Sequence, residues 1–349
     1  MSKLYANPFI WGEPVSSTHY NPRPEEQSLI LAAIEQQTPL VITGNRGSGK
    51  TSLLRQVIEK SPIPSIYFDL SFVVNREGLI NLLLAGIEKS YPQAKTDGSV
   101  AALHTQGGKT TLDAVFELWY ELVKNNDKKF VIVWDEFQHL AKQKENIVEE
   151  LRVCMKDRRS IAHIFISPRE DVLNEIFSDP NKPFFVKIEK LRVGNLNLQS
   201  TSRYLSQRFR RMGLSDFDLP EAIWNFTEGQ AQLTQRLAYC LAQIWLEGTT
   251  SRLLERSIGK LLIQENVLYT AQWDNFGLNE KRLLMGLASG YSRPTELGFI
   301  SMFGLSATST AHNTVLKLLR EGWLVNRDEG YHIYNPIFLK WLQASRGLS

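Results

Sequence analysis

The stretch Gly44-Asn45-Arg46-Gly47-Ser48-Gly49-Lys50-Thr51 matches every fixed position of the phosphate-binding loop pattern G-x-x-x-x-G-K-[ST]. An apolar run at 39–43 precedes the loop and indicates a buried parallel strand. Residues 52–58 follow with apolar side chains at helical spacing. Glycines allow backbone N–H groups to turn toward phosphate oxygens, and the helix start adds the positive end of its dipole. The stretch therefore predicts a nucleotide site between a strand and a helix.

Individual side chains of this loop have separate predicted roles. Lys50 is expected to reach the β- and γ-phosphates, and the Thr51 hydroxyl to hold Mg²⁺. The rest of the loop, with Ser52 in the first helical turn, is expected to surround the phosphates of ATP or ADP. The alternative is a chance glycine-rich turn, which the flanking strand and helix disfavour.

A second motif supplies the groups that hydrolysis needs. Residues 130–134 are entirely apolar, as in a central parallel strand, and Asp135 and Glu136 follow directly. Ligands bind beyond the carboxyl ends of parallel strands, so Asp135 is expected at the Mg²⁺ site with Thr51. Glu136 is the candidate general base that polarises the attacking water. The alternative is an acidic pair on the surface.

The predicted strand at 161–166 ends in a further polar group. Ser167 would lie between the two earlier strand ends and could sense the γ-phosphate, while Arg169 could add positive charge during hydrolysis. The same residues also fit a helix start, with Ser167 as the N-cap and Pro168 at the first helical position. Both interpretations can hold together.

Alternating strands and helices predict an α/β fold with a parallel sheet covered on both faces. Strands are expected at 39–43, 65–70, 130–134, 161–166 and 184–188, and a loop at 92–110. From about residue 195 the pattern is helical, and three short helices with a hairpin at 322–334 then indicate a winged helix-turn-helix. The expected domains are an N-terminal arm (1–24), a P-loop core (25–193), an all-helical lid (194–272) and a winged helix (273–349).

Composition places few limits on function. The 349 residues are 43% hydrophobic and 22% charged, with a formal net charge of +3. The two cysteines, Cys154 and Cys240, lie in helical patterns and indicate buried free thiols. No stretch approaches the ~20 apolar residues that cross a bilayer. We therefore expect a cytoplasmic protein with no membrane partner.

The motifs together resemble the AAA+/STAND ATPases, and within them the archaeal-type and the initiator (origin-recognition-like) ATPases. The resemblance rests on the phosphate loop, on Trp134-Asp135-Glu136-Phe137, on Ser167, and on a helical lid followed by a winged helix. It extends over nearly the whole chain and implies ATP binding and hydrolysis. Residues 7–9 and 334–341 also look like this group.

The resemblance implies further nucleotide contacts. Tyr20 and Arg23 would lie near the adenine, although Pro22 and Pro24 depart from the family pattern, and a surface arm is the alternative. Arg236 would reach the γ-phosphate from the lid, or else be an ordinary solvated residue.

Ring-forming relatives place an arginine finger before the fifth strand. Residues 178–183 contain Lys182 and no arginine, which disfavours a ring activated in trans, although Arg158 and Arg159 could serve at an interface. A homo-oligomer stays possible.

The winged helix is a candidate for binding double-stranded DNA. Small and hydrogen-bonding residues at 306–313, among them Thr308 and Asn313, begin the helix expected to enter the groove. Arg293, Lys317 and Arg327 are the candidate phosphate contacts. Eight Lys/Arg against five Asp/Glu at 276–349 make the region only moderately basic.

Three functional hypotheses follow. The first is a DNA-associated ATPase switch in initiation, transposition or mobile-element control. The second is a signalling or defence switch whose winged helix contacts a protein partner or its own core. The third is a nucleotide-stabilised adaptor that barely turns over.

Overall fold

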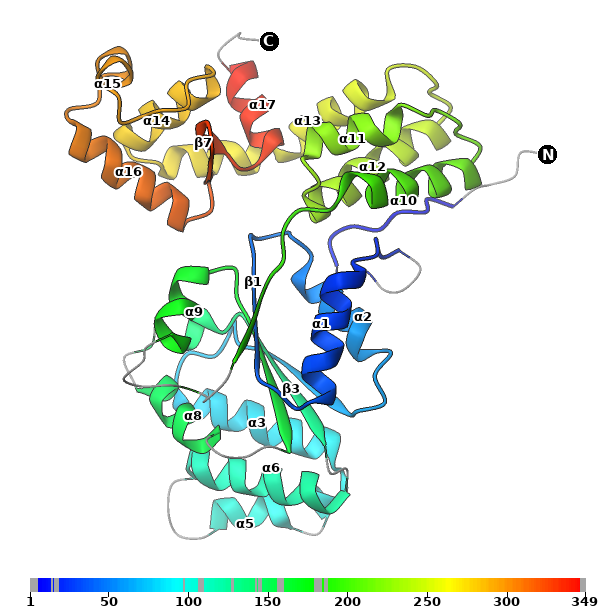
Figure 1. Cartoon of the computed structure of the whole chain (residues 1–349), viewed down its shortest axis with the longest axis vertical. Helices are drawn as coiled ribbons and strands as arrows, with labels where there is room; N and C mark the ends of the chain where they lie inside the picture. The colour runs from blue at the N-terminus through cyan, green and yellow to red at the C-terminus, as the bar shows by residue number, and fades with distance from the viewer. Residues whose placement is uncertain are drawn as a thin grey trace. The chain divides into compact units, whose positions relative to one another are not determined.

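The computed structural model describes residues 6–13, 15, 19–96, 98–105, 110–126, 129–141, 143, 146–155, 160–178, 184 and 188–345. The chain forms two compact units (Figure 1). The core unit is Pro14–Gly194, and the second unit combines Met1–Glu13 with Asn195–Ser349. Within the described residues no helix is both long and apolar enough to cross a membrane.

A five-stranded sheet forms the centre of the core unit. Its order is β2-β3-β4-β1-β5, and every neighbouring pair is parallel. The strands are β1 (Leu40–Thr43), β2 (Ser65–Asp69), β3 (Phe130–Asp135), β4 (Ile161–Ile166) and β5 (Glu189–Arg192). This order makes β2 and β5 the edges and places the carboxyl ends of β1, β4 and β3 side by side.

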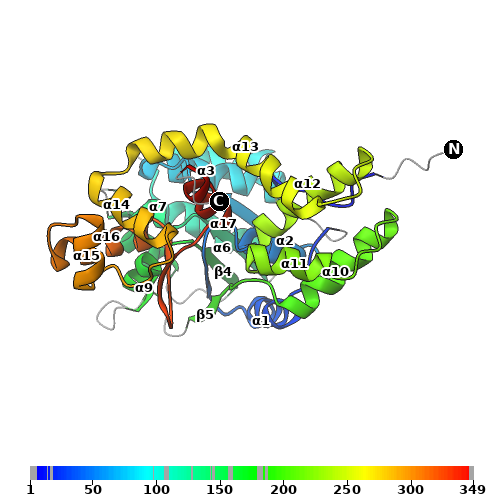
Figure 2. The ribbon, with the colours of Figure 1, turned by 90° about the horizontal axis from the view of Figure 1, so that it is seen from above.

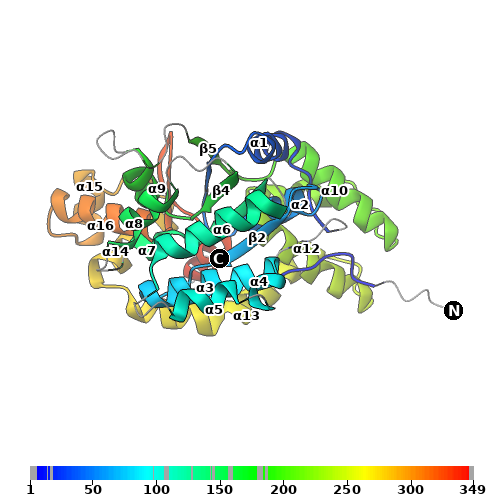
Figure 3. The same ribbon diagram turned by 90° about the horizontal axis from the view of Figure 1, so that it is seen from below.

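Helices cover both faces of the sheet. Successive side chains of β3 point to opposite faces, and because all of them are apolar, both faces must be covered. Val131 and Val133 join the cluster formed with α1 (Pro24–Glu35) and α2 (Lys50–Ile58). Phe130, Ile132 and Trp134 join the cluster formed with α3 (Arg76–Ser90) and α6 (Leu112–Asn126). Figure 3 shows α3 and α6 together on their face of the sheet. The predicted fold class is observed.

Shorter helices complete the core unit, and two expectations are wrong. Residues 92–110 contain α4 (Gln93–Thr96) and α5 (Ser99–Thr105) instead of a loop, because Ala94 and Val100 pack into the core. The fifth strand of the sheet is β5 instead of the expected span: Phe184 and Ile188 are described outside any strand, with Phe184 buried in the core, and 185–187 lie outside the described residues. The remaining helices are α7 (Gln138–Ala141), α8 (Ile147–Met155) and α9 (Glu170–Phe177).

The second unit joins lid helices and a winged helix around one continuous hydrophobic core. The lid helices are α10 (Leu198–Arg211), α11 (Leu219–Thr227), α12 (Ala231–Leu246) and α13 (Leu253–Asn275). The winged helix contains α14 (Leu278–Ala288), α15 (Leu297–Phe303), α16 (Thr308–Arg320), the antiparallel strands β6 (Leu324–Arg327) and β7 (Gly330–Ile333), and α17 (Pro336–Ser345). Figure 2 shows the long α13 leading directly into α14.

The N-terminal segment packs against the lid helices of the same unit. Phe9 is buried, with its ring 5.2 Å from that of Phe209, and Asn7 Nδ2 donates to Tyr239 O at 3.0 Å. Trp11 approaches the Tyr239 ring edge-on. The Phe9 ring is therefore part of the lid core.

Candidate functional site

The phosphate loop has the backbone that its glycines predict. Gly44, Gly47 and Gly49 have φ of +143°, +77° and +91°, values that L side chains rarely adopt. A Cβ on Gly44 would also lie 2.3 Å from Val193 O, so the adjoining chain leaves no room for a side chain. The loop then enters α2 at Lys50, with Gly49 as its N-cap residue.

Lys50 is buried at the centre of this loop. Its Nζ donates to Gly44 O at 2.8 Å and to Asn45 O at 3.0 Å, so loop carbonyls satisfy the ammonium group. Burial lowers the Lys50 pKa to about 8, although the charges of Asp135 and Glu136 partly oppose the change. Phosphate oxygens placed here would favour the charged form of Lys50.

Thr51 and Asp135 meet beside the loop as predicted for a metal site. Thr51 Oγ1 donates to Asp135 Oδ2 at 3.2 Å. Burial raises the Asp135 pKa, opposed by hydrogen bonds from the Glu136 N–H and from Thr51. A hydroxyl and a carboxylate are oxygen ligands of the kind that Mg²⁺ takes together with substrate phosphates. The residues present fit that ion.

Glu136 is held in a strained position directly after β3. Its φ of +55° is uncommon for a side chain of this size, and such strain is frequent at functional sites. Gln138 Nε2 donates to Glu136 Oε2 at 2.5 Å, and His139 Nε2 lies 3.8 Å from the same oxygen. Sequence reasoning missed Gln138. The only signal was its position two residues after the candidate base.

Ser167 lies between the two motifs because β4 separates β1 from β3. Its N–H donates to Ile42 O at 3.2 Å, and its Oγ accepts from the Arg169 N–H at 2.9 Å. The N-cap of α9 is Arg169, so the alternative with Ser167 as N-cap and Pro168 at the first helical position is wrong. Arg169 makes a two-pronged ion pair with Asp171, which raises the Arg169 pKa.

Arg23 contacts the phosphate loop from outside it. Its Nη2 donates to Ser48 O at 2.9 Å and to Gly194 O at 2.8 Å, and its Nη1 pairs with Glu26 at 3.1 Å. Arg23 is buried and so fixes the loop backbone to the end of the core unit. Tyr20 packs at the edge of the α1–α2 cluster, where burial raises its pKa. Neither observation tests the predicted adenine contacts.

The lid candidate Arg236 is engaged inside the second unit. It forms an ion pair with Glu265 of α13, and its guanidinium lies 4.7 Å from the centroid of the Trp11 ring. It is therefore not the solvated residue of the alternative interpretation, and a role toward phosphate stays a prediction. Arg158, Arg159 and Lys182 lie outside the described residues.

All three cations predicted to contact DNA phosphates are paired with carboxylates. Arg293 pairs with Glu296 at 3.2 Å. Lys317 pairs with Glu280, and Arg327 of the wing pairs with Glu228 at the end of α11. Thr308 and Asn313 are exposed on α16, as the groove-binding prediction requires.

The Lys317–Glu280 pair is the most enclosed of the three. Glu280 is buried, and its carboxylate also accepts from the Gly277 N–H at 2.8 Å. Burial alone would raise the Glu280 pKa, but hydrogen bonds from Lys317 and Gly277 lower it overall. The hydrogen bond to Glu280 raises the Lys317 pKa.

A protein-family model described as an ATPase domain predominantly from Archaea matches residues 25–237, and one described as a probable winged helix domain matches 267–344. The first match spans more than half of the chain. The chain belongs to this family of archaeal-type ATPases. Comparison with curated protein sequences gave no match.

Solved structures support the same fold at low sequence identity. A Walker-type ATPase of Pyrococcus abyssi is 18% identical, with a TM-score of 0.70 over 93% of this chain and 96% of the other. The Aeropyrum pernix ORC2 protein, solved in ADPNP–ADP complexes, is 13% identical, with a TM-score of 0.60 over 100% and 99%. The Aeropyrum pernix ORC1 protein, solved in complex with DNA, is 12% identical, with a TM-score of 0.52 over 94% of each chain.

These findings confirm three of the predictions. The chain is an ATPase of the archaeal type, it has the P-loop fold that it shares with the solved structures, and it carries a C-terminal winged helix. The domain boundaries and the role of each site residue stay predictions, although the structure brings Lys50, Thr51, Asp135 and Glu136 together.

Proposed function

We propose that this ATPase is a DNA-associated molecular switch, in which the nucleotide state of the core unit governs what the winged helix can bind. The observation that carries the proposal is the connection of the winged helix to the lid. Gln230 Nε2, at the start of α12, donates to Tyr334 O at 2.5 Å, and Tyr269 of α13 packs 5.2 Å from Phe338 of α17. Any displacement of the lid therefore moves the winged helix with it.

Hydrolysis is assigned to residues of the core unit. Lys50 would bind the phosphate charge, the loop N–H groups would orient the phosphates, and Glu136 would take a proton from water. Mg²⁺, held by Thr51 and Asp135, would supply positive charge to the phosphate oxygens when bound. Gln138 would set the direction of the Glu136 carboxylate.

The exposed face of α16 supports contact with DNA. It presents Ser309, His312 and Asn313 over two turns, and Arg320 extends the same helix. Short hydrogen-bonding side chains permit the close approach that base edges and phosphates require. The ORC1 protein of Aeropyrum pernix, which shares the fold, was solved in complex with DNA.

A signalling switch of the STAND type is the second candidate. The observation that favours it is the ion pair between Arg327 and Glu228, which engages the wing with its own lid. While Arg327 is paired with Glu228 of the lid, it is not available to contact a DNA phosphate. In this case release of the wing, and not DNA binding, would be the output.

Binding of a fluorescent DNA duplex, measured across a salt series, tests the proposal. The test variant replaces Arg293, Lys317 and Arg327 by alanine, and the control replaces three exposed cations of the same unit, Arg203, Arg256 and Lys340. We expect the test variant to bind more weakly, with a log–log salt slope lower by about one unit per lost contact. Equal losses in both variants, or no binding by the wild type at low salt, would reject the DNA role.

A further inference from the structure

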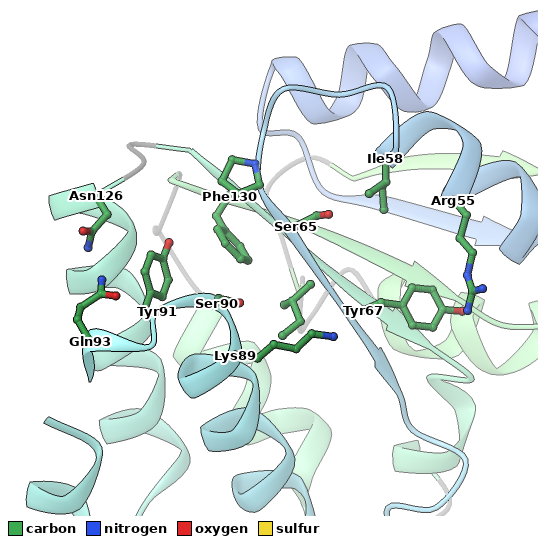
Figure 4. A pocket seen from close by; sticks show the side chains of 12 residues that line it. Arg55, Ile58, Ser65, Tyr67, Lys89, Ser90, Tyr91, Gln93, Asn126 and Phe130 are labelled. Carbon is green, nitrogen blue, oxygen red and sulfur yellow. The ribbon is translucent and has the colours of Figure 1, made fainter. Parts of the chain in front are cut away.

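A groove runs along the free edge of the core sheet, away from the phosphate loop. Its volume is about 740 Å³. Arg55 and Ile58 of α2 line one side, Lys89 and Ser90 of α3 line the other, and β2 forms the floor (Figure 4). Gln93 and Asn126 supply amide side chains at one end. No residue of the nucleotide motifs lines this groove.

The floor of the groove carries unpaired peptide groups. Strand β2 pairs only with β3, and the bonds Val131 N–Pro64 O and Leu70 N–Asp135 O show which of its peptide groups face that neighbour. Peptide groups alternate in direction along a strand, so those of Ser65, Tyr67 and Asp69 face outward. Among the described residues, these outward groups have no hydrogen-bond partner. Such an edge is a template for another strand.

Both walls of the groove carry a cation that lacks a carboxylate partner in the described part of the chain. Arg55 lies over the Tyr67 ring, 5.5 Å from its centroid, and Lys89 is exposed at the end of α3. No carboxylate is among the residues that line the groove: Glu88 pairs with Lys95 at 3.1 Å, and Glu59 lies outside the lining. The groove therefore favours an anionic partner. The groove differs in this respect from the winged helix, where each cation predicted to contact DNA pairs with a carboxylate.

We propose that this edge binds an extended, acidic segment of a partner protein, which adds to the sheet beside β2. Alternate residues of an added strand point to opposite faces of the sheet. Arg55 belongs to the face covered by α2 and Lys89 to the face covered by α3, so two adjacent acidic residues would meet one cation each. Backbone pairing supplies affinity and the two cations supply selectivity. The proposal holds whether or not the winged helix binds DNA.

A labelled peptide of three Val-Glu-Glu repeats is a suitable probe, with binding to the full-length chain followed by fluorescence anisotropy. The test variant is Arg55→Glu with Lys89→Glu. The control, Lys60→Glu with Lys124→Glu, makes the same change in net charge at exposed positions outside the groove. Exposed ion pairs contribute a few-fold in affinity each. We therefore expect about tenfold weaker binding in the test variant and little change in the control.

Two further peptides separate strand addition from simple charge attraction. A version with N-methylated backbone amides cannot pair with the edge, and a version with lysine in place of glutamate has the wrong charge. Both should fail to bind the wild type. Saturable binding of either one, equal losses in the two variants, or no saturable binding of the original peptide would overturn the proposal. Self-association of the chain that the test variant abolishes, without any peptide binding, would overturn it as well.

Discussion

The phosphate loop and the winged helix both use positive charge, but they hold it in different ways. Lys50 is buried and its ammonium is bound by two carbonyls of its own loop. Arg293, Lys317 and Arg327 are exposed, and each is neutralised by a carboxylate. The loop is therefore preorganised for an anion, whereas in the proposed DNA complex the winged helix would first exchange its carboxylates for phosphates.

This difference predicts unequal sensitivity to substitution. Removing a buried cation weakens anion binding strongly, because the site stays desolvated but no longer carries a positive charge. Exposed ion pairs contribute at most about 1 kcal/mol each and rearrange readily. The predictions below run from the largest effect to the smallest.

Glu136→Gln should nearly abolish hydrolysis and leave ATP binding intact. Glutamine keeps the shape of the side chain but cannot accept the proton from water, and general base catalysis contributes about 10²–10⁴-fold. Single-turnover hydrolysis of radiolabelled ATP measures the effect. Glu77→Gln, an exposed acid of α3 outside the nucleotide motifs, is the matched control. A wild-type rate in Glu136→Gln would remove this residue from the mechanism.

Lys50→Ala should weaken ATP binding by about 30-fold to several thousand-fold, the range measured when a buried, hydrogen-bonded charge is removed. Equilibrium binding of labelled ATP checks this, with Lys60→Ala at the exposed end of the same helix region as the control. Unchanged affinity in Lys50→Ala would mean that the phosphates bind elsewhere.

ATP affinity should fall at alkaline pH because the Lys50 pKa is about 8 in the nucleotide-free protein. Below pH 8 the Lys50 ammonium is already charged, so its protonation does not make ATP affinity depend on pH. Above pH 8 Lys50 is neutral and must take up a proton before it can bind the ATP phosphates. The affinity for ATP should therefore drop about tenfold per pH unit. Binding measured from pH 7 to 10 tests the slope. Lys50→Arg, which stays charged, should lack it.

Glu228→Gln should raise DNA affinity a few-fold, because it frees Arg327 from its ion pair while leaving the fold intact. Glu221→Gln, an exposed change on the same helix, should have no effect. If both variants bind DNA like the wild type, the wing does not use Arg327 on phosphate, and the interpretation in which the wing serves its own lid becomes the stronger one.

The sequence predicts the features that depend on local order. The phosphate loop, the apolar β3 and the carboxylates after it follow from neighbouring residues, and the structure agrees with each. The fifth strand, which lies at β5 and not at the predicted span, shows where prediction from local order fails. Four of the five residues at 184–188 are apolar, whereas β5 is an edge strand with only Leu191 buried, so its own composition gives little signal.

Pairings between distant residues could not be predicted from sequence. Arg236 pairs with Glu265, and Arg327 pairs with Glu228, 99 residues earlier in the chain. Arg23 shows the same limit: its hydrogen bonds to Ser48 O and Gly194 O join residues 25 and 171 positions apart in the chain, and the adenine contact implied by the family resemblance stays a prediction. Tertiary packing decides such partners, and no periodicity encodes them.

Steady-state ATP hydrolysis with and without duplex DNA tests the central claim most directly. The wild type and Glu136→Gln would be assayed at low and at physiological salt. A DNA-associated switch predicts that DNA changes the wild-type rate, that salt suppresses the change, and that Glu136→Gln stays inactive throughout. A wild-type rate indifferent to DNA at both salt concentrations would contradict the claim and leave an ATPase whose winged helix serves another partner.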